Sequence, residues 1–260
     1  MVTQFRAIYA KSRRFLLPIL QLRTVLKEPT AGEMEDTLAS LSRNLPDAFE
    51  ETYARIQRLP ESRRRLGTNT LMWISHAKRA LTIYELSEAL SVRLGQVNMS
   101  PKHCPSPKMI VECCQGLVTL DSESMSIGLA HYTIQEYLIG QSERLFSCAE
   151  SNIATTCLTY LLFDAFKEGP CSEEIEIYSR IEKNPFFSYA CRYWGVHAQI
   201  SEADQDVQRL IFTFLNSYSA VARAYQILEF ERDRREEYWN PEECLSGSYS
   251  RNPICLPGLS

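Results

Sequence analysis

The sequence has no long hydrophobic run, no large excess of either charge and no regular cysteine pattern. The longest apolar run near its beginning, Phe15–Leu20, is too short to span a bilayer and follows charged residues without a small-residue cleavage site. We therefore expect neither a signal peptide nor a membrane helix, and we expect the protein to remain in the cytoplasm. The net charge of −4 and the pI near 5.7 give no general attraction to nucleic acid or to anionic membranes.

The motifs of several common active sites are also missing. None of the ten glycines is followed by lysine, so the Gly-Lys-Ser/Thr cradle for nucleotide phosphates is absent. No Gly-x-Ser-x-Gly elbow supplies a serine nucleophile. We expect no catalytic residue in this chain and no enzyme activity.

The nine cysteines are an odd number without paired C-x₂-C spacings, which favours reduced and mostly buried thiols. Four possible zinc ligands nevertheless lie close in sequence, at His103, Cys104, Cys113 and Cys114. Without paired spacings these residues predict core packing rather than a metal site, and we expect no bound metal. His76 and His197 lie among apolar neighbours at helical spacing, so we interpret both as hydrogen-bonded structural histidines.

The middle of the chain predicts three helices followed by a hairpin. An amphipathic helix is expected directly after Pro60. Thr82 and Glu85 have the spacing of a capping box, which predicts the beginning of a short second helix. A third helix is expected over Pro107–Gln115. Alternation of apolar and polar residues on both sides of a polar turn then predicts a β-hairpin, over residues 118–121 and 125–130.

The hairpin is followed without a linker by a segment in which two N-terminal motifs predict a helix. Thr133 followed by Glu136 predicts a capping box, and Tyr132 with Tyr137 predicts a hydrophobic staple, so we expect a helix from Thr133 to about Leu145. His131 would then lie just outside the helix N-terminus. Unpaired N–H groups and the positive end of the helix dipole favour a phosphate or carboxylate at such a position.

Helix, helix, helix, hairpin, helix is the order of a winged-helix domain. The expected fold is therefore mainly α, with one small β-hairpin and helical segments on both sides. An aromatic-rich helix after Asn184-Pro185 should be largely buried, and the stretch from Asn240 onwards suggests a loose tail. The run Arg63–Arg65 at a helix beginning fits a solvated helix face better than a surface for an acidic partner, which stays the alternative.

The run Leu129–Leu138 resembles the histidine-containing strand–helix signature of the winged helix in NACHT-type signal-transduction NTPases. From about Phe15 to Ala198 the chain is similar to fungal NACHT–ankyrin proteins, notably over Arg79–Leu90 and Cys114–Val118. The winged helix of those proteins is classed with that of GPI inositol-deacylase. They carry an upstream P-loop and downstream ankyrin repeats, and neither signature occurs here, so the chain resembles a truncated member.

The resemblance implies a non-catalytic regulatory region of a signalling NTPase, acting as a switch element. It implies that ATP or ADP binds only in the intact architecture, with His131 contacting the β-phosphate of ADP, although a purely structural His131 remains open. The partner would be a NACHT NTPase domain in the same or another chain, with an oligomer as a further option. The expected domains are C-terminal helices of a NACHT-like module, the winged helix, a helical domain and a tail, over residues 1–59, 60–146, 147–239 and 240–260.

The main alternative is a DNA-binding winged helix. A recognition helix needs positive or amide side chains directed at the groove. Pro107–Gln115 offers one lysine, Lys108, against Glu112, and is otherwise mostly apolar or cysteine. The sequence therefore disfavours a nucleic-acid partner.

Overall fold

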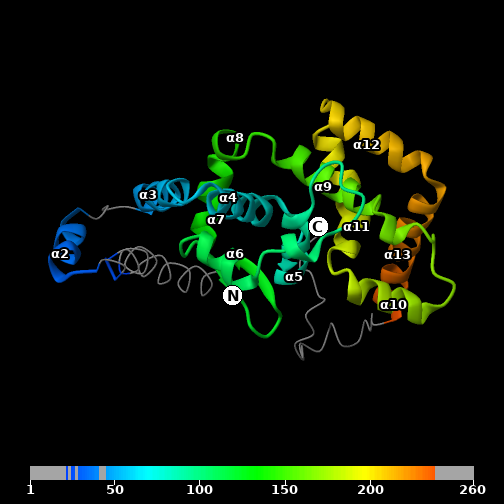
Figure 1. The fold of residues 1–260 in the computed structure, drawn as a ribbon, viewed down its shortest axis with the longest axis horizontal. Helices are drawn as coiled ribbons and strands as arrows, with labels where there is room; N and C mark the ends of the chain where they lie inside the picture. The colour runs from blue at the N-terminus through cyan, green and yellow to red at the C-terminus, as the bar shows by residue number, and fades with distance from the viewer. Residues whose placement is uncertain (1–21, 23–24, 27–28, 41–44, 238–260) are drawn as a thin grey trace, which may run out of the picture. The chain divides into compact units, whose positions relative to one another are not determined.

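The computed structural model describes residue 22 and residues 25–26, 29–40 and 45–237 (Figure 1). These residues are mostly helical and include one small antiparallel sheet, which confirms the expected mainly α fold. Most of the segment before Leu26 and the expected tail from Asn240 lie outside the described residues. Within the described part of the chain, no helix combines the length and the apolar character needed to cross a membrane.

The described residues divide into two compact units. The first lies within residues 1–91, 101–121 and 125–149, and the second lies within residues 92–100, 122–124 and 150–260. The first unit contains seven α-helices of the described chain: α2 Ala31–Ser40, α3 Leu45–Gln57, α4 Glu61–His76, α5 Ile83–Ser91, α6 Pro107–Cys113, α7 Tyr132–Gly140 and α8 Ser142–Leu145. A short 3₁₀ turn, η1 Pro101–His103, precedes α6.

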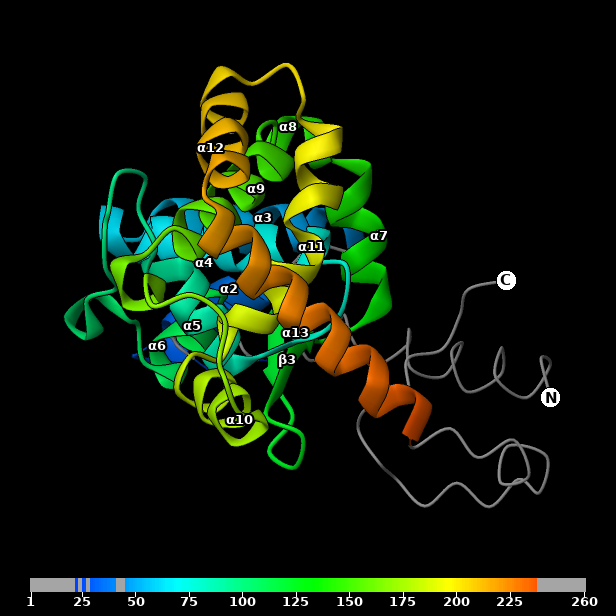
Figure 2. The same cartoon turned by 90° about the vertical axis from the view of Figure 1, so that its right-hand side faces the viewer.

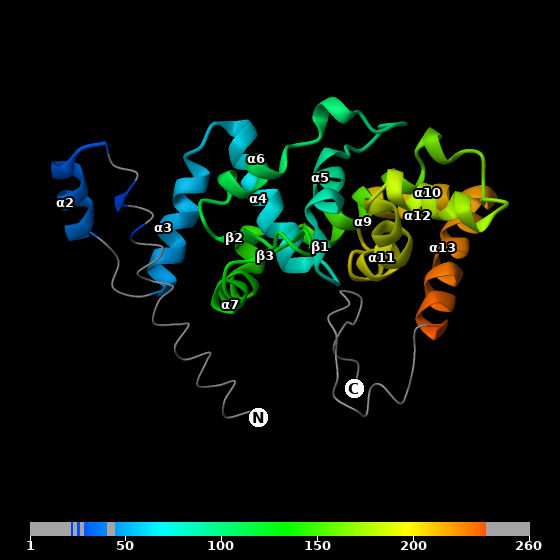
Figure 3. The ribbon, with the colours of Figure 1, turned by 90° about the horizontal axis from the view of Figure 1, so that it is seen from below.

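The sheet of the first unit has three strands in the order β1-β3-β2 (Figure 3). The predicted hairpin is confirmed as β2 Val118–Leu120 paired with β3 Ser126–Leu129. A third strand was not predicted: β1 Leu81–Thr82 pairs with β3, placing Leu81 opposite Ile127. Helix, strand, two helices and a hairpin is the element order of a winged helix, and α4 and α7 lie against the sheet (Figure 3).

Close packing of α4 on α6 fixes the core of this unit. Gly67 leaves no room for a side chain, because a Cβ there would lie 2.6 Å from the carbonyl oxygen of Cys113 and 3.1 Å from Cγ2 of Ile56. Cys113 and Cys114 are buried, as expected of core thiols. Helix α6 ends at Cys113 rather than at the expected Gln115, because Gln115 and Gly116 both turn to positive φ, 52° and 94°.

The second unit contains α9 Ala149–Leu161, whose first residue belongs to the first unit, and then η2 Asp164–Phe166, α10 Glu174–Lys183, α11 Phe186–Ile200, α12 Gln205–Asn216 and α13 Tyr218–Glu237. Helix α13 packs beside α11 and α12 (Figure 2). The aromatic helix after Pro185 is confirmed as α11, and Phe186, Phe187 and Tyr189 are fully buried in it. Helix α10 was not predicted.

Candidate functional site

His131 lies where strand β3 passes into helix α7. The amide of Ala130 donates to the carbonyl of Leu117 at 2.9 Å, which holds the strand end in place. His131 itself is extended and is the N-cap residue of α7, because its Nδ1 accepts a hydrogen bond from the amide of Thr133 at 3.2 Å. The ring therefore anchors the first turn of the helix.

This geometry corrects the capping box predicted for α7. The helix begins at Tyr132, one residue earlier than expected, so Thr133 occupies its second position and the cap is His131. The helix also ends at Gly140, and a separate short helix follows from Ser142 to Leu145. The break is consistent with the low helix propensity of glycine.

Tyr137 does not pair with Tyr132 as the predicted staple required. Its ring packs against Phe49 with centroids 5.3 Å apart, and its hydroxyl donates to the carboxylate of Glu50. Arg144 donates to the same carboxylate at 2.7 Å. Burial and the Glu50 carboxylate raise the pKa of Tyr137 to about 12. Tyr137 thus ties α7 to α3 and leaves Tyr132 beside His131, with ring centroids 4.5 Å apart.

The contacts of His131 decide which ring nitrogen carries its proton. A backbone N–H can only donate, so Nδ1 must present its lone pair to Thr133. The Oγ1 of Thr133 lies 2.9 Å from the same nitrogen and can donate as well. In the neutral imidazole the proton is then on Nε2. His131 thus caps the helix through one nitrogen, and its other nitrogen is a donor.

A pocket of about 380 Å³ adjoins this ring. Its lining combines the strand residues Ile127 to Leu129 with the end of α4, the Arg79–Leu81 segment and Gln135 of α7. Apolar side chains form most of the surface, and His131, Arg79 and Gln135 supply polar groups. The pocket lies wholly within the first unit.

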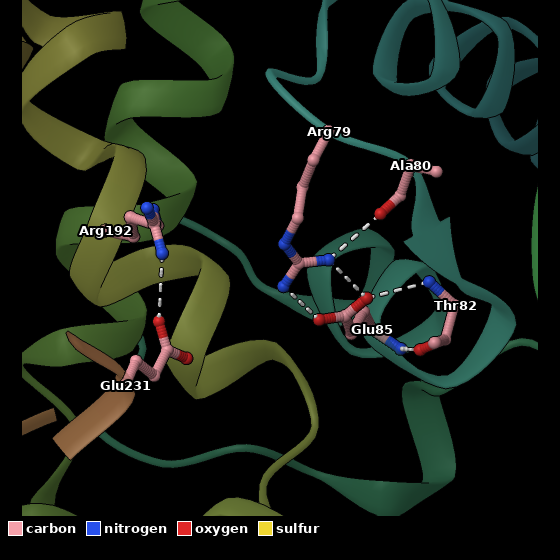
Figure 4. A network of polar contacts seen from close by, with 6 residues as sticks. All are labelled: Arg79, Ala80, Thr82, Glu85, Arg192 and Glu231. Carbon is pink, nitrogen blue, oxygen red and sulfur yellow. Dashed lines mark hydrogen bonds and ion pairs between the residues drawn. The ribbon is translucent and has the colours of Figure 1, made fainter. Parts of the chain in front are cut away.

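The charge of Arg79 in this pocket is already balanced (Figure 4). Its two terminal nitrogens donate to the two carboxylate oxygens of Glu85 at 2.9 and 2.5 Å, and one of them also donates to the carbonyl of Ala80 at 3.0 Å. Glu85 is in turn held by the predicted capping box, which is confirmed: it accepts from the amide of Thr82 at 2.7 Å, and its own amide donates to Oγ1 of Thr82 at 3.2 Å. The ion pair between Arg79 and Glu85 was not predicted from the sequence, where its only signal is an arginine six residues before the capping glutamate.

The half-buried His76 and the buried His197 are both hydrogen-bonded within the protein, as expected. His76 contacts the carbonyl of Met72 at 3.0 Å and Oγ of Ser142 at 3.1 Å. His197 is fully buried in the second unit, where it contacts Glu150 and Tyr189. That unit also contains an ion pair between Arg192 and Glu231 at 3.4 Å, drawn in Figure 4.

Among the described residues, no group of three or more histidine, cysteine or acidic side chains could hold a metal ion. His103 is exposed on η1 and Cys104 is half-buried. Burial raises the pKa of Cys113 and raises that of Cys114 further. A raised pKa keeps a thiol protonated and a poor nucleophile, so these two cysteines behave as core residues.

Helix α6 takes the place of a recognition helix in this fold. Its one lysine, Lys108, lies 3.8 Å from the carboxylate of Glu112 one turn away. The exposed charges of the helix therefore offset each other, which gives a DNA phosphate or base edge little to bind.

Comparison with known proteins supports the winged helix. Residues 53–151 match the family model described as GPI inositol-deacylase, winged helix domain, and this match covers less than half of the chain. Together with the strand order and the hairpin, this match defines a winged-helix domain. No curated protein and no solved structure matches the chain.

Proposed function

We propose that this chain is a non-catalytic regulatory region of a NACHT-type signal-transduction NTPase, in which the winged helix is the switch element. The resemblance of Leu129–Leu138 to the NACHT signature suggests this assignment, and the matched winged-helix family supports its structural half. The NACHT assignment, and the fungal origin that the resemblance implies, are part of the proposal. The observation that carries it is the position of His131 at the cap of α7 beside a pocket.

The local physics suits a phosphate contact at His131. The N-cap lies at the positive end of the helix dipole, which favours an anion nearby. With Nδ1 accepting from Thr133, the proton on Nε2 gives the neutral ring a donor for a phosphate oxygen. In NACHT proteins the matching histidine contacts the β-phosphate of ADP, and we assign the same role to His131 when an NTPase domain holds the nucleotide.

The winged helix alone offers too little to hold a nucleotide. Arg79 is neutralised by Glu85, and the phosphate cradle motif is absent from the sequence. A single neutral donor is worth only about 0.5–1.5 kcal/mol net. We therefore propose that the chain is not an enzyme and that ATP or ADP belongs to the partner NTPase domain, in the same or another chain of a cytoplasmic assembly.

The proposal keeps the expected division of the chain, with NACHT-like helices before residue 60, the winged helix over 60–146 and a helical domain over 147–239. It also keeps protein as the partner in place of nucleic acid. The DNA-binding alternative predicts tight, sequence-specific binding of duplex DNA that Lys108→Ala abolishes. The Lys108–Glu112 pair argues against it.

The test measures ADP release. A NACHT NTPase domain is fused ahead of this chain and loaded with a fluorescent ADP analogue, whose dissociation rate is followed after dilution into unlabelled ADP. We expect the chain to slow dissociation about tenfold relative to the NTPase domain alone, a typical coupling between two sites. His131→Asn should remove this effect, because asparagine can still accept from the Thr133 amide but lacks the ring donor.

His103→Asn is the matched control, because His103 is exposed on η1 and is not among the residues that line the pocket beside His131. It should retain slow release. If His131→Asn releases ADP as slowly as the parent protein, His131 only fastens the hairpin to the helix and the proposed role is wrong.

A further inference from the structure

A second surface of the first unit, distinct from the His131 pocket, carries four exposed arginines close together in sequence. Arg58 follows α3, and Arg63, Arg64 and Arg65 lie in the first turns of α4. None of the four side chains forms a hydrogen bond or ion pair with another residue of the described ranges 22, 25–26, 29–40 and 45–237. With the one glutamate between them, the segment carries a charge of +3 in a chain whose net charge is −4. We name Arg58 and Arg63–Arg65 the arginine patch.

Helix stability does not explain the arginine patch. Positive side chains in the first turns of a helix oppose its dipole, which favours acidic residues there. The N-cap, Pro60, provides no side-chain hydrogen bond that would offset this cost. The three arginines of α4 therefore concentrate positive potential at a helix beginning without stabilising the helix.

One member of the arginine patch, Arg63, lines an apolar groove of about 490 Å³. Leu59, Val111 and Cys113 contribute apolar walls. Arg63 lies close enough to Cys113 to lower the pKa of that thiol, against the larger upward effect of burial. Glu112 also lines the groove, and its carboxylate forms an ion pair with Lys108.

We propose that the arginine patch and this groove form a docking surface for an acidic segment of another protein, with carboxylates on the arginines and an apolar side chain in the groove. Arginine suits this role, since its planar guanidinium binds a carboxylate through two parallel hydrogen bonds. A polyanion such as DNA needs no apolar groove, and the net charge of −4 repels it over the remaining surface. The surface is independent of the proposed role of His131.

The test uses the full chain and a short fluorescein-labelled helical peptide of glutamate and leucine, with leucines at helical spacing. Fluorescence anisotropy should detect binding that weakens about tenfold as salt rises from about 0.1 to about 0.5 M, because exposed charges are screened. Two further peptides are matched controls. Replacing glutamate by lysine, or leucine by serine, should each abolish binding.

Charge reversal locates the site. Arg63→Glu with Arg64→Glu should weaken binding about tenfold or more, as expected when attraction becomes repulsion across an interface. Arg93→Glu with Lys102→Glu changes the net charge by the same amount at exposed positions outside the arginine patch, and should leave affinity within about twofold. Val111→Thr keeps the side-chain shape, makes the groove polar and should also weaken binding. Unchanged thermal unfolding midpoints confirm that the variants fold.

The proposal is overturned if the acidic peptide fails to bind the parent chain at millimolar concentration, or if the Arg63/Arg64 and Arg93/Lys102 variants lose affinity equally. It is also overturned if duplex DNA, or vesicles of phosphatidylserine and phosphatidylcholine, bind through Arg63 and Arg64 while the acidic peptide does not.

Discussion

His131 and His197 lie in different units, and each ring joins two segments of its own unit. Nδ1 of His197 contacts Oε2 of Glu150 at 2.5 Å, Nε2 contacts the hydroxyl of Tyr189 at 2.9 Å, and the residue has no exposed surface. His131 is half-buried, binds the Thr133 amide through Nδ1 and lines a pocket.

The difference separates two uses of the same side chain. A histidine enclosed with protein partners on both nitrogens contributes its hydrogen bonds to stability and has no route to a ligand. A histidine anchored at a pocket wall can fix a helix and still present its ring to a ligand. The comparison predicts that substitutions at His197 affect mainly stability, whereas those at His131 affect stability little and nucleotide retention strongly.

The largest effect is expected at His197. His197→Ala should lower the free energy of unfolding by about 3 kcal/mol, because it removes both hydrogen bonds and leaves the buried Tyr189 hydroxyl and the Glu150 carboxylate without this ring. Tyr189→Phe removes one of the two bonds and should cost about 1 kcal/mol. Urea unfolding followed by circular dichroism measures both. If His197→Ala lowers the free energy of unfolding by less than about 1 kcal/mol, the hydrogen bonds of His197 contribute little to stability and this interpretation is wrong.

Gly67 tests how tightly α4 packs against α6 in the first unit. Gly67→Ala should cost about 2 kcal/mol, because the new Cβ meets the Cys113 carbonyl and Ile56, and backbone must shift. Gly195→Ala in α11 is the matched control: a Cβ there meets nothing within 4 Å, so the better helix propensity of alanine should stabilise slightly. Equal effects of the two substitutions would show that α4 and α6 can separate without cost.

A smaller effect is expected at His131. His131→Ala should cost about 1 kcal/mol, the usual value for losing an N-cap. His131→Asn should cost less than about 0.5 kcal/mol, since asparagine caps well. The same urea measurement applies. If asparagine destabilises as much as alanine, the ring stabilises the junction through packing and the two proposed roles cannot be separated by this substitution.

The smallest effect concerns pH and the cap of α12. Hydrogen bonds from the amide of Val207, the side chain of Ser151 and the amide of Asp206 lower the pKa of Asp204 below its ordinary 3.8. Because the folded pKa lies below the unfolded one, the stabilisation is present above the unfolded value and is lost as pH falls through the folded pKa. Unfolding measured between about pH 5 and pH 2 should show this loss, and Asp204→Asn should reduce it. An unchanged pH profile would mean that the carboxylate is not essential to the cap.

The sequence predicted those elements that depend on residues close to one another along the chain. The Thr82–Glu85 capping box and the hairpin are both present, because each depends on residues a few positions apart. Strand β1 could not be predicted, since two residues carry no periodicity and pair with β3 more than forty residues later. The ion pair between Arg79 and Glu85 depends on the path of the chain from Arg79 through β1 into α5, and it could be recognised only once that path was known.

The sequence predicted the position of His131 at the strand–helix junction, and the structure confirms that position, but the predicted cap of the helix was wrong. Thr133 and Glu136 have the spacing of a capping box, but the ring of His131 reaches the Thr133 amide and starts the helix one residue earlier. Spacing alone cannot distinguish a Thr133 cap from a His131 cap. Which residue caps the helix depends on the direction in which the chain leaves strand β3. The pocket beside His131 was not predictable either, since its walls come from α4, β3 and α7.

The role of His131 depends on its tautomer: Nδ1 accepts a hydrogen bond from the Thr133 amide, and Nε2 carries the proton. Nitrogen-15 NMR of the imidazole rings in the full chain, assigned to His131 by comparison with His131→Asn, reports the tautomer directly. We expect an unprotonated Nδ1 and a protonated Nε2 in the neutral ring. A neutral ring protonated on Nδ1 would rule this arrangement out, because Nδ1 could then not accept the hydrogen bond from the Thr133 amide that caps α7.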